Sequence, residues 1–208
     1  MKKILLIVDP QIDFCDSKKG SLYVKGAEEK MSALGEWIKK ENPDHIFITL
    51  DSHYPGHISF KNTWINKKGD KPSIFSTIKP KEEGWTTYLT DTPPAEIQIW
   101  PEHCILGTEG WCIFQPLYET IKKWCLSNKT TWTPLRKGME ERYEEYGAFN
   151  QQGNRNIAKT FFNRADLFVG GVAGDYCVKE CIEQLKELGL TPIPLKECIA
   201  WIGDEQEI

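Results

Sequence analysis

The sequence has little that marks a nucleic-acid-binding, membrane or disulfide-rich protein. Its net charge is only −4 and its lysines and arginines are scattered, which argues against nucleic acid as a partner. The apolar run of residues 4–8 is far too short to span a bilayer, and no signal peptide is visible. The seven cysteines show no paired CxxC spacing, so neither a disulfide framework nor a cysteine-type zinc site is indicated. We expect a cytoplasmic protein with reduced cysteines, although their oxidation stays open.

Short apolar runs alternate with longer amphipathic stretches along most of the 208 residues. Strands are expected over residues 3–8, 45–50, 96–100, 130–135, 167–169 and 191–195, and helices over 27–40, 114–126, 154–162 and 177–188. Such alternation predicts a three-layer α/β fold, a doubly wound parallel sheet with helices on both faces. We expect one domain over residues 1–208, with a long irregular insertion at about 54–95.

Residues with reactive side chains follow the ends of several predicted strands, where parallel sheets bind ligands. Asp9 follows the first strand and is either a turn residue or a site residue. Lys137 follows the fourth, as a solvated charge or as a cation that neutralises Asp9 and favours a nearby thiolate. Cys177 stands at the mouth of a predicted helix, where the dipole would lower the thiol pKa and backbone amides could hold an oxyanion. A buried structural cysteine is the alternative.

A metal site is indicated by the few histidines of the chain. Asp51 and His53 are two residues apart on an extended segment, so their side chains point the same way. His103 follows the next predicted strand, and the three side chains suit zinc or another divalent first-row metal. His57 is either a further ligand or a loop residue. The alternative is a set of surface histidines without a ligand role.

Five motifs together resemble those of a known family. They are VDPQIDFC, TLDSHYPGHISF, WPEHCILGTEG, RKGMEERYEEYGAF and GVAGDYCVKECI, in the family's order from Lys3 to about Leu195. In these motifs the chain resembles the nicotinamidases (pyrazinamidase-like enzymes) within the isochorismatase-like cysteine hydrolases. The resemblance implies the isochorismatase-like fold with six parallel strands, and a cis peptide bond between Val172 and Ala173. It also implies catalytic residues Asp9, Lys137 and Cys177, and metal ligands Asp51, His53 and His103.

The implied activity is an amidohydrolase reaction that converts nicotinamide to nicotinic acid and ammonia, as in NAD salvage. Cys177 would form a thioester, Asp9 would move protons, and the N–H groups of Ala173 and Cys177 would hold the oxyanion. A divalent metal, zinc before iron or manganese, would orient the pyridine ring. Phe14 and Trp64 would form apolar walls of the substrate pocket, or be ordinary core residues.

Departures from the family pattern leave alternatives open. Gly174 and Gly147 stand where the family usually has Thr and Ser, the 54–95 stretch is unusually long, and few residues follow Leu195. A related cysteine amidase or isochorismatase-type hydrolase acting on another small molecule is therefore a second hypothesis. An inactive relative that binds a metal or ligand is a third. A small-molecule substrate is expected in the first two, and a homo-oligomer stays open.

Overall fold

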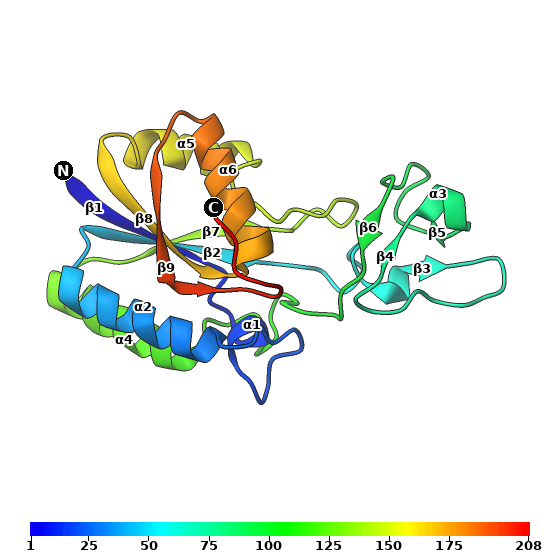
Figure 1. The fold of residues 1–208 in the computed structure, drawn as a ribbon, viewed down its shortest axis with the longest axis horizontal. Helices are drawn as coiled ribbons and strands as arrows, with labels where there is room; N and C mark the ends of the chain where they lie inside the picture. Colours follow the sequence, from blue (N-terminus) through cyan, green and yellow to red (C-terminus); the bar gives the residue numbers. More distant parts are fainter.

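A five-stranded parallel sheet lies at the centre of the computed structural model, which describes residues 1–208, with helices on both sides (Figure 1). The strand order is β7-β2-β1-β8-β9, and every neighbouring pair is parallel. The strands are β1 (Lys2–Val8), β2 (His45–Asp51), β7 (Thr133–Lys137), β8 (Ala165–Val172) and β9 (Pro192–Ala200). Because all five run the same way, their carboxyl ends meet at one edge, where ligands bind in such sheets.

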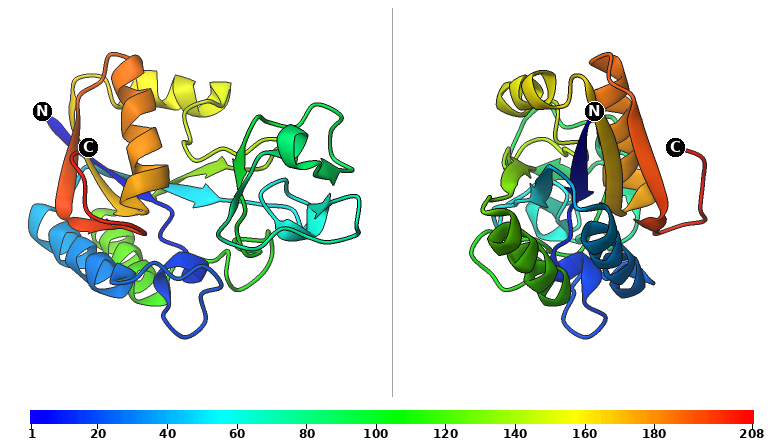
Figure 2. Two further views of the ribbon diagram at one scale, coloured as in Figure 1. Left: turned by 45° about the vertical axis from the view of Figure 1, so that its right-hand side comes forward. Right: turned by 90° about the vertical axis from the view of Figure 1, so that its left-hand side faces the viewer.

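Alternation along the central strand β1 explains the three layers. Leu5 and Ile7 belong to one core cluster, whereas Ile4, Leu6 and Val8 belong to the other. Successive side chains of a strand point to opposite faces, so the aliphatic part of this strand, residues 4–8, must be covered on both. Figure 2 shows the two helical layers, with α2 and α4 on one face and α5 and α6 on the other. Their bounds are α2 (Ala27–Glu41), α4 (Gln115–Asn128), α5 (Gln152–Phe161) and α6 (Lys179–Glu187).

Helix α2 shows how the sequence directs these layers. Met31, Leu34 and Ile38 recur at helical spacing and are buried against the sheet. Two glutamates in its first turn and two lysines in its last turn complement the helix dipole. Asn42 ends the helix in the left-handed conformation, which asparagine tolerates better than most residues. None of the helices is long and apolar enough to cross a membrane.

The central sheet has five strands, so the expected count of six is not reproduced. The segment expected as a strand over 96–100 contributes only β6 (Ile97–Gln98), which pairs with β4 (Thr77–Ile78) outside the central sheet. Ile97 and Ile99 bury their side chains in a separate apolar cluster. Their alternation with polar neighbours predicted a strand correctly but could not say which sheet the strand would join.

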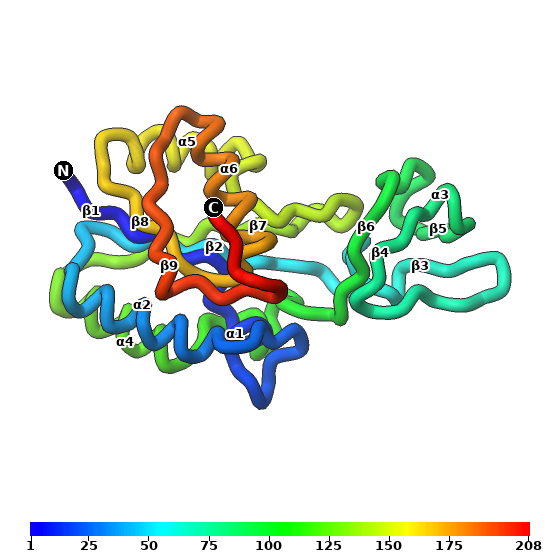
Figure 3. Tube along the Cα trace, in the orientation of Figure 1, coloured from blue at the N-terminus to red at the C-terminus, as the bar shows by residue number.

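Residues 54–99 form a side lobe that projects from the site end of the sheet (Figures 1 and 3). It contains a 3₁₀ turn (Lys61–Thr63), β3 (Trp64–Ile65), β4, α3 (Pro80–Glu83), β5 (Thr86–Thr87) and β6. The lobe has its own small core, formed by Ile58, Trp64, Ile78, Ile97 and Ile99. The long irregular stretch of the sequence is thus held together by a handful of large apolar side chains rather than by regular structure.

Candidate active site

Strand register brings the reactive side chains together at the carboxyl edge of the sheet. In the β2–β7 pair, Asp51 lies opposite Lys137. Asp9 directly follows β1, the neighbour of β2, and its backbone is left-handed with φ 47°. Cys177 follows β8, the other neighbour of β1, in a π-helical turn (Gly174–Val178) that leads into α6. Four residues that are far apart in the sequence therefore share one buried site.

The Lys137 ammonium is the centre of this cluster. Its Nζ lies 3.0 Å from Asp9 Oδ2, 2.9 Å from Asp51 Oδ1 and 3.5 Å from Cys177 Sγ. Burial by itself would lower the pKa of this lysine, but the Asp51 and Asp9 carboxylates raise it well above its usual range. The side chain is therefore a fixed positive charge between two carboxylates and a sulfur.

Asp9 is a buried carboxylate with one oxygen available for proton transfer. The Thr49 hydroxyl donates to Oδ1 at 2.6 Å, and the Asp9 N–H donates to the same hydroxyl at 3.0 Å. Oδ2 makes the ion-pair contact with Lys137 but has no well-aligned hydrogen bond. Burial raises the Asp9 pKa, while Lys137 acts in the opposite direction. A raised carboxyl pKa together with a free oxygen suits a general base.

The thiol of Cys177 is not the preformed thiolate that the helix mouth suggested. Burial raises its pKa well above the usual value, and the lowering by Lys137 is opposed by the Asp9 carboxylate. The prediction of a lowered thiol pKa is therefore wrong, because the sulfur is enclosed rather than exposed at a helix end. The resting thiol keeps its proton and needs a base. The peptide bond between Val172 and Ala173 is cis, as the resemblance implied.

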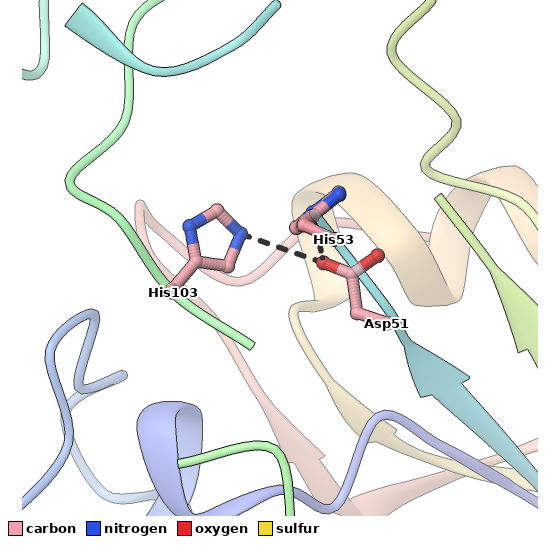
Figure 4. A group of neighbouring side chains, drawn as sticks. All are labelled: Asp51, His53 and His103. Carbon is pink, nitrogen blue, oxygen red and sulfur yellow. Dashed lines mark hydrogen bonds and ion pairs between the residues drawn. The ribbon is translucent and has the colours of Figure 1, made fainter. Parts of the chain in front are cut away.

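Asp51, His53 and His103 converge beside this cluster (Figure 4). His53 Nε2 and His103 Nε2 lie 2.9 and 3.4 Å from Asp51 Oδ2. The other ring nitrogens donate to backbone carbonyls, His53 Nδ1 to Gly138 at 2.9 Å and His103 Nδ1 to Pro101 at 2.8 Å. The Nδ1 atoms of both rings are thus engaged by backbone carbonyls, and both Nε2 atoms face the Asp51 carboxylate, with one ligand atom of each residue within 4.8 Å of the others. The donor set fits a divalent metal.

His57 lies against this donor set but is already occupied. The Ser59 hydroxyl lies 2.8 Å from its Nδ1, and its Nε2 donates to the Tyr143 carbonyl at 3.0 Å. Its ring centroid is 4.0 Å from that of His53. Burial and the neighbouring His53 lower the His57 pKa to about 3. Of the two roles that the sequence left open, the structure favours a loop residue that packs behind His53.

A narrow pocket with a cavity volume of about 30 Å³ opens beside the cysteine. Phe14 lines it as expected, with its ring 5.4 Å from His103. Trp64 does not line it, and of the two roles that the sequence left open the structure favours an ordinary core residue. Trp64 is the largest residue of the side-lobe core, and its indole N–H donates to the Ile58 carbonyl at 2.6 Å. The Trp64 side chain is therefore buried in the core of the side lobe and does not reach the pocket.

Three other aromatic residues supply the pocket walls that the sequence interpretation had sought in Trp64. Trp100 packs edge-on against Tyr176 at 5.2 Å, and its indole N–H donates to the Tyr146 hydroxyl at 3.2 Å. Trp100 ends the predicted strand 96–100 and Tyr176 precedes Cys177. The rule that site residues follow strand ends could have found both, whereas Tyr146 lies in a loop without such a signal.

Glu144 is a further carboxylate of the pocket that the sequence did not reveal. It belongs to the acidic stretch 140–145, and charge runs of this kind usually form a solvated face. Instead its side chain lines the pocket, and its buried Oε2 has no hydrogen-bond partner. Burial raises the Glu144 pKa, against the lowering by His53. Charge density along the chain did not show that one glutamate of the run turns inward.

Comparisons with known proteins agree with this geometry. No family model matches the chain. A nicotinamidase of Saccharomyces cerevisiae is 28% identical over 215 residues, which covers 99% of this chain and 91% of the relative. A nicotinamidase of Escherichia coli is 27% identical over 90% of this chain and 78% of the relative. A Mycobacterium tuberculosis nicotinamidase/pyrazinamidase is 24% identical over 99% of this chain and 90% of the relative.

Solved structures show the same likeness. The yeast nicotinamidase Pnc1p superposes with a TM-score of 0.72 at 25% identity, over 98% of this chain and 90% of that chain. A structure of Pnc1p bound to the inhibitor nicotinaldehyde gives a TM-score of 0.72 at 27% identity, with the same coverage of both chains. Motifs, fold and site geometry agree, and over nearly its whole length the chain is similar to the nicotinamidases.

Proposed function

We propose that the protein is an amide hydrolase that converts nicotinamide to nicotinic acid and ammonia. The observation that carries the proposal is that Asp9 and Cys177 both contact the Lys137 ammonium. The Asp51–His53–His103 donor set and an aromatic pocket lie beside this cluster. The small-molecule ligand named for the yeast neighbour, nicotinaldehyde, has the same pyridine ring as the proposed substrate. We further propose that residues 1–208 act as one hydrolase domain that includes the side lobe.

The first half of the reaction is the attack of the sulfur on the amide. Asp9 accepts the Cys177 proton, and the thiolate forms a bond to the amide carbon as the carbonyl electrons move to oxygen. Lys137 keeps the two carboxylates ionised in the resting site and stabilises the thiolate during proton transfer, because its Nζ lies 3.5 Å from the sulfur. This base is required because burial has raised the thiol pKa.

The oxyanion is assigned to backbone donors of the turn. Ala173 and Cys177 both border the pocket, and their N–H groups would hold the negative oxygen. Losing one such donor typically costs about 2.7–4 kcal/mol of transition-state stabilisation. Asp9 then returns its proton to the departing ammonia, which leaves an acyl thioester on Cys177. Water activated by Asp9 cleaves the thioester, and nicotinic acid and the free thiol result.

The chain's residues orient the substrate before the sulfur attacks. Phe14 and Trp100 would flank the ring. Because they exclude water, the electrostatic interactions between the charged groups around Cys177 become stronger. Asp51, His53 and His103 would hold the metal, and zinc is the first choice for one carboxylate and two imidazoles. A bound divalent metal would supply a Lewis-acidic position for the pyridine nitrogen.

Ammonia release from nicotinamide by the metal-loaded protein tests the proposal. We expect turnover by the wild type and none above background by Cys177→Ala. Cys181→Ala is the matched control, because Cys181 is a buried cysteine one helical turn further along α6. Full activity of Cys177→Ala would exclude covalent catalysis through this thiol. Preference of the wild type for an amide without a pyridine ring would replace nicotinamide by another small-molecule amide.

A further inference from the structure

The segment that follows β9 is fastened to the turn that carries the nucleophile. β9 and β8 run in parallel with Val172 opposite Ala200, so the next residue, Trp201, emerges beside the turn that starts at Ala173. Asp175 in that turn accepts hydrogen bonds from the backbone of the segment. Its Oδ1 accepts from the Ile202 N–H at 3.1 Å and its Oδ2 accepts from the Gly203 N–H at 2.8 Å. Figure 3 shows the red chain passing the start of α6 at this point.

Trp201 fills the space next to Gly174. A Cβ atom on Gly174 would lie far inside van der Waals contact with Cδ2 and Cε2 of the indole. Glycine in a turn is usually a point of conformational freedom. The structure shows the reverse, because the absent side chain is replaced by a packed ring. The indole N–H is buried without an acceptor, so packing rather than hydrogen bonding holds Trp201 in place.

The same segment reaches the substrate pocket. Ile202 lines the pocket together with Ala173 and Cys177, and is still 44% exposed at the mouth. The residue beside the indole thus borders the space where a substrate ring would enter. The three consecutive residues Trp201 to Gly203 therefore both attach this segment to the nucleophile turn and line part of the pocket.

We propose that residues 201–203 are a latch that positions the nucleophile turn, and that Ile202 limits the size of the ring that the pocket accepts. The latch acts through Gly174 and Asp175 and does not touch the reacting atoms, so Trp201 and Asp175 are positioning residues. The role of Ile202 rests on the proposed function, since it concerns substituents on the nicotinamide ring. The latch itself does not, because it concerns the order of the turn in the free protein.

The order of the turn is measured without any substrate. We expect Trp201→Ala to increase amide hydrogen exchange in residues 174–178 and to accelerate alkylation of Cys177 by iodoacetamide, each by about tenfold or more. Trp201→Phe keeps a ring over Gly174 and should stay near the wild type. Trp37→Ala is the matched control, since Trp37 packs against Phe168 on another face. Equal effects of Trp201→Ala and Trp37→Ala, or no effect of Trp201→Ala, would overturn the latch.

The complementarity of Gly174 and Trp201 gives a second test. Gly174→Ala should lower kcat/KM for nicotinamide by about 100-fold, because the new methyl displaces the turn. Adding Trp201→Ala vacates the space, so the double variant should recover at least about tenfold of that loss. An unimpaired Gly174→Ala enzyme, or a double variant no better than Gly174→Ala, would contradict the proposal. If the variants show the expected differences in hydrogen exchange but the wild-type protein does not hydrolyse nicotinamide, the proposed function is refuted and the latch proposal stands.

Ring selectivity tests Ile202 separately. We expect Ile202→Ala to raise the ratio of kcat/KM for 5-methylnicotinamide to that for nicotinamide by about tenfold, the usual discrimination of a pocket for one methyl group. Ile202→Val should give a smaller change in the same direction. An unchanged ratio in Ile202→Ala would remove the selectivity role.

Discussion

The site edge of the sheet and the side lobe each enclose a cluster of buried residues, but the two clusters hold opposite kinds of side chain. At the sheet edge, Asp9, Asp51 and Lys137 are buried, and the Lys137 ammonium lies within 3.0 Å of an oxygen of each carboxylate. In the side lobe the enclosed residues are large and apolar, with Trp64 at their centre. Buried charge costs desolvation free energy that its ion pairs only partly offset, whereas buried apolar surface is the main source of stability.

The difference teaches where activity and stability reside. The charged cluster is arranged for chemistry, so a substitution there should change the rate more than the free energy of unfolding. The side lobe has few regular hydrogen bonds and depends on a small core, so a substitution there should change stability more than chemistry. Four experiments can break or sharpen this contrast.

Asp9→Asn should have the largest effect. The amide cannot accept the Cys177 proton, so we expect kcat to fall by about 10²–10⁴-fold. Lys137 keeps its 2.9 Å contact with Asp51, so the free energy of unfolding should change by no more than about 2 kcal/mol. Steady-state kinetics and urea denaturation measure the two effects. A large loss of stability with little loss of rate would reverse the comparison.

Trp64→Ala should destabilise the side lobe. Removing a fully buried tryptophan costs about 3–5 kcal/mol, and here the Ile58 carbonyl also loses its donor. We expect the loss as faster hydrogen exchange within residues 58–99, with kcat reduced less than about tenfold because Trp64 does not touch the pocket. Tyr88→Ala is the control, since Tyr88 is 75% exposed and its loss should change stability by less than about 0.5 kcal/mol. Comparable effects of the two variants would contradict the assignment of Trp64 to a core.

His103→Ala and His57→Ala should separate the metal ligands from their surroundings. We expect His103→Ala to weaken metal affinity by at least about 100-fold, because it removes one of three converging donors. His57→Ala should weaken it by about tenfold or less, since both of its nitrogens are engaged elsewhere. Competition with a chelator of known affinity measures both. Equal losses would make His57 a ligand.

Alkylation of cysteines should show the smallest but most direct effect of burial. At pH 7.5, iodoacetamide should label the exposed Cys112 before the buried Cys177. Because burial raises the Cys177 pKa, its thiolate fraction is small at neutral pH and its labelling should keep rising through pH 9. Mass spectrometry of the two peptides after timed reaction measures this. A Cys177 rate that levels off by pH 7 would restore the lowered pKa that the sequence suggested.

Much of the site could be predicted because strand ends are visible in the sequence. Apolar runs before Asp9 and Asp51 end where β1 and β2 end. Lys137 is the last residue of the more polar β7, and parallel strands must bring these ends together. The alternation of strands and helices predicted the layers for the same reason. The roles of these residues in catalysis remain predictions, which the variants above address.

The errors also have physical causes. Trp64 and Trp100 are chemically alike, and only the folding of the side lobe decided which one faces the pocket. Glu144 turns inward from a run of acidic residues because its loop folds over the pocket. Gly174 reads as a point of freedom until Trp201 is seen against it. In each case the outcome depends on a contact between two segments that are distant in the sequence. The apolar or charged character of a residue does not show which other segment it will contact.

The sequence by itself determined which side chains stand at the ends of apolar strands, because hydrophobic periodicity is a local property of the chain. Strand ends predicted a parallel sheet and placed the candidate side chains at its edge, but they did not give the number of strands, which is five rather than six. The tertiary structure alone decided how deeply these groups are buried, and with it the direction of the Cys177 pKa. It also decided which aromatic residues enclose the pocket, since desolvation and packing arise only when distant segments meet.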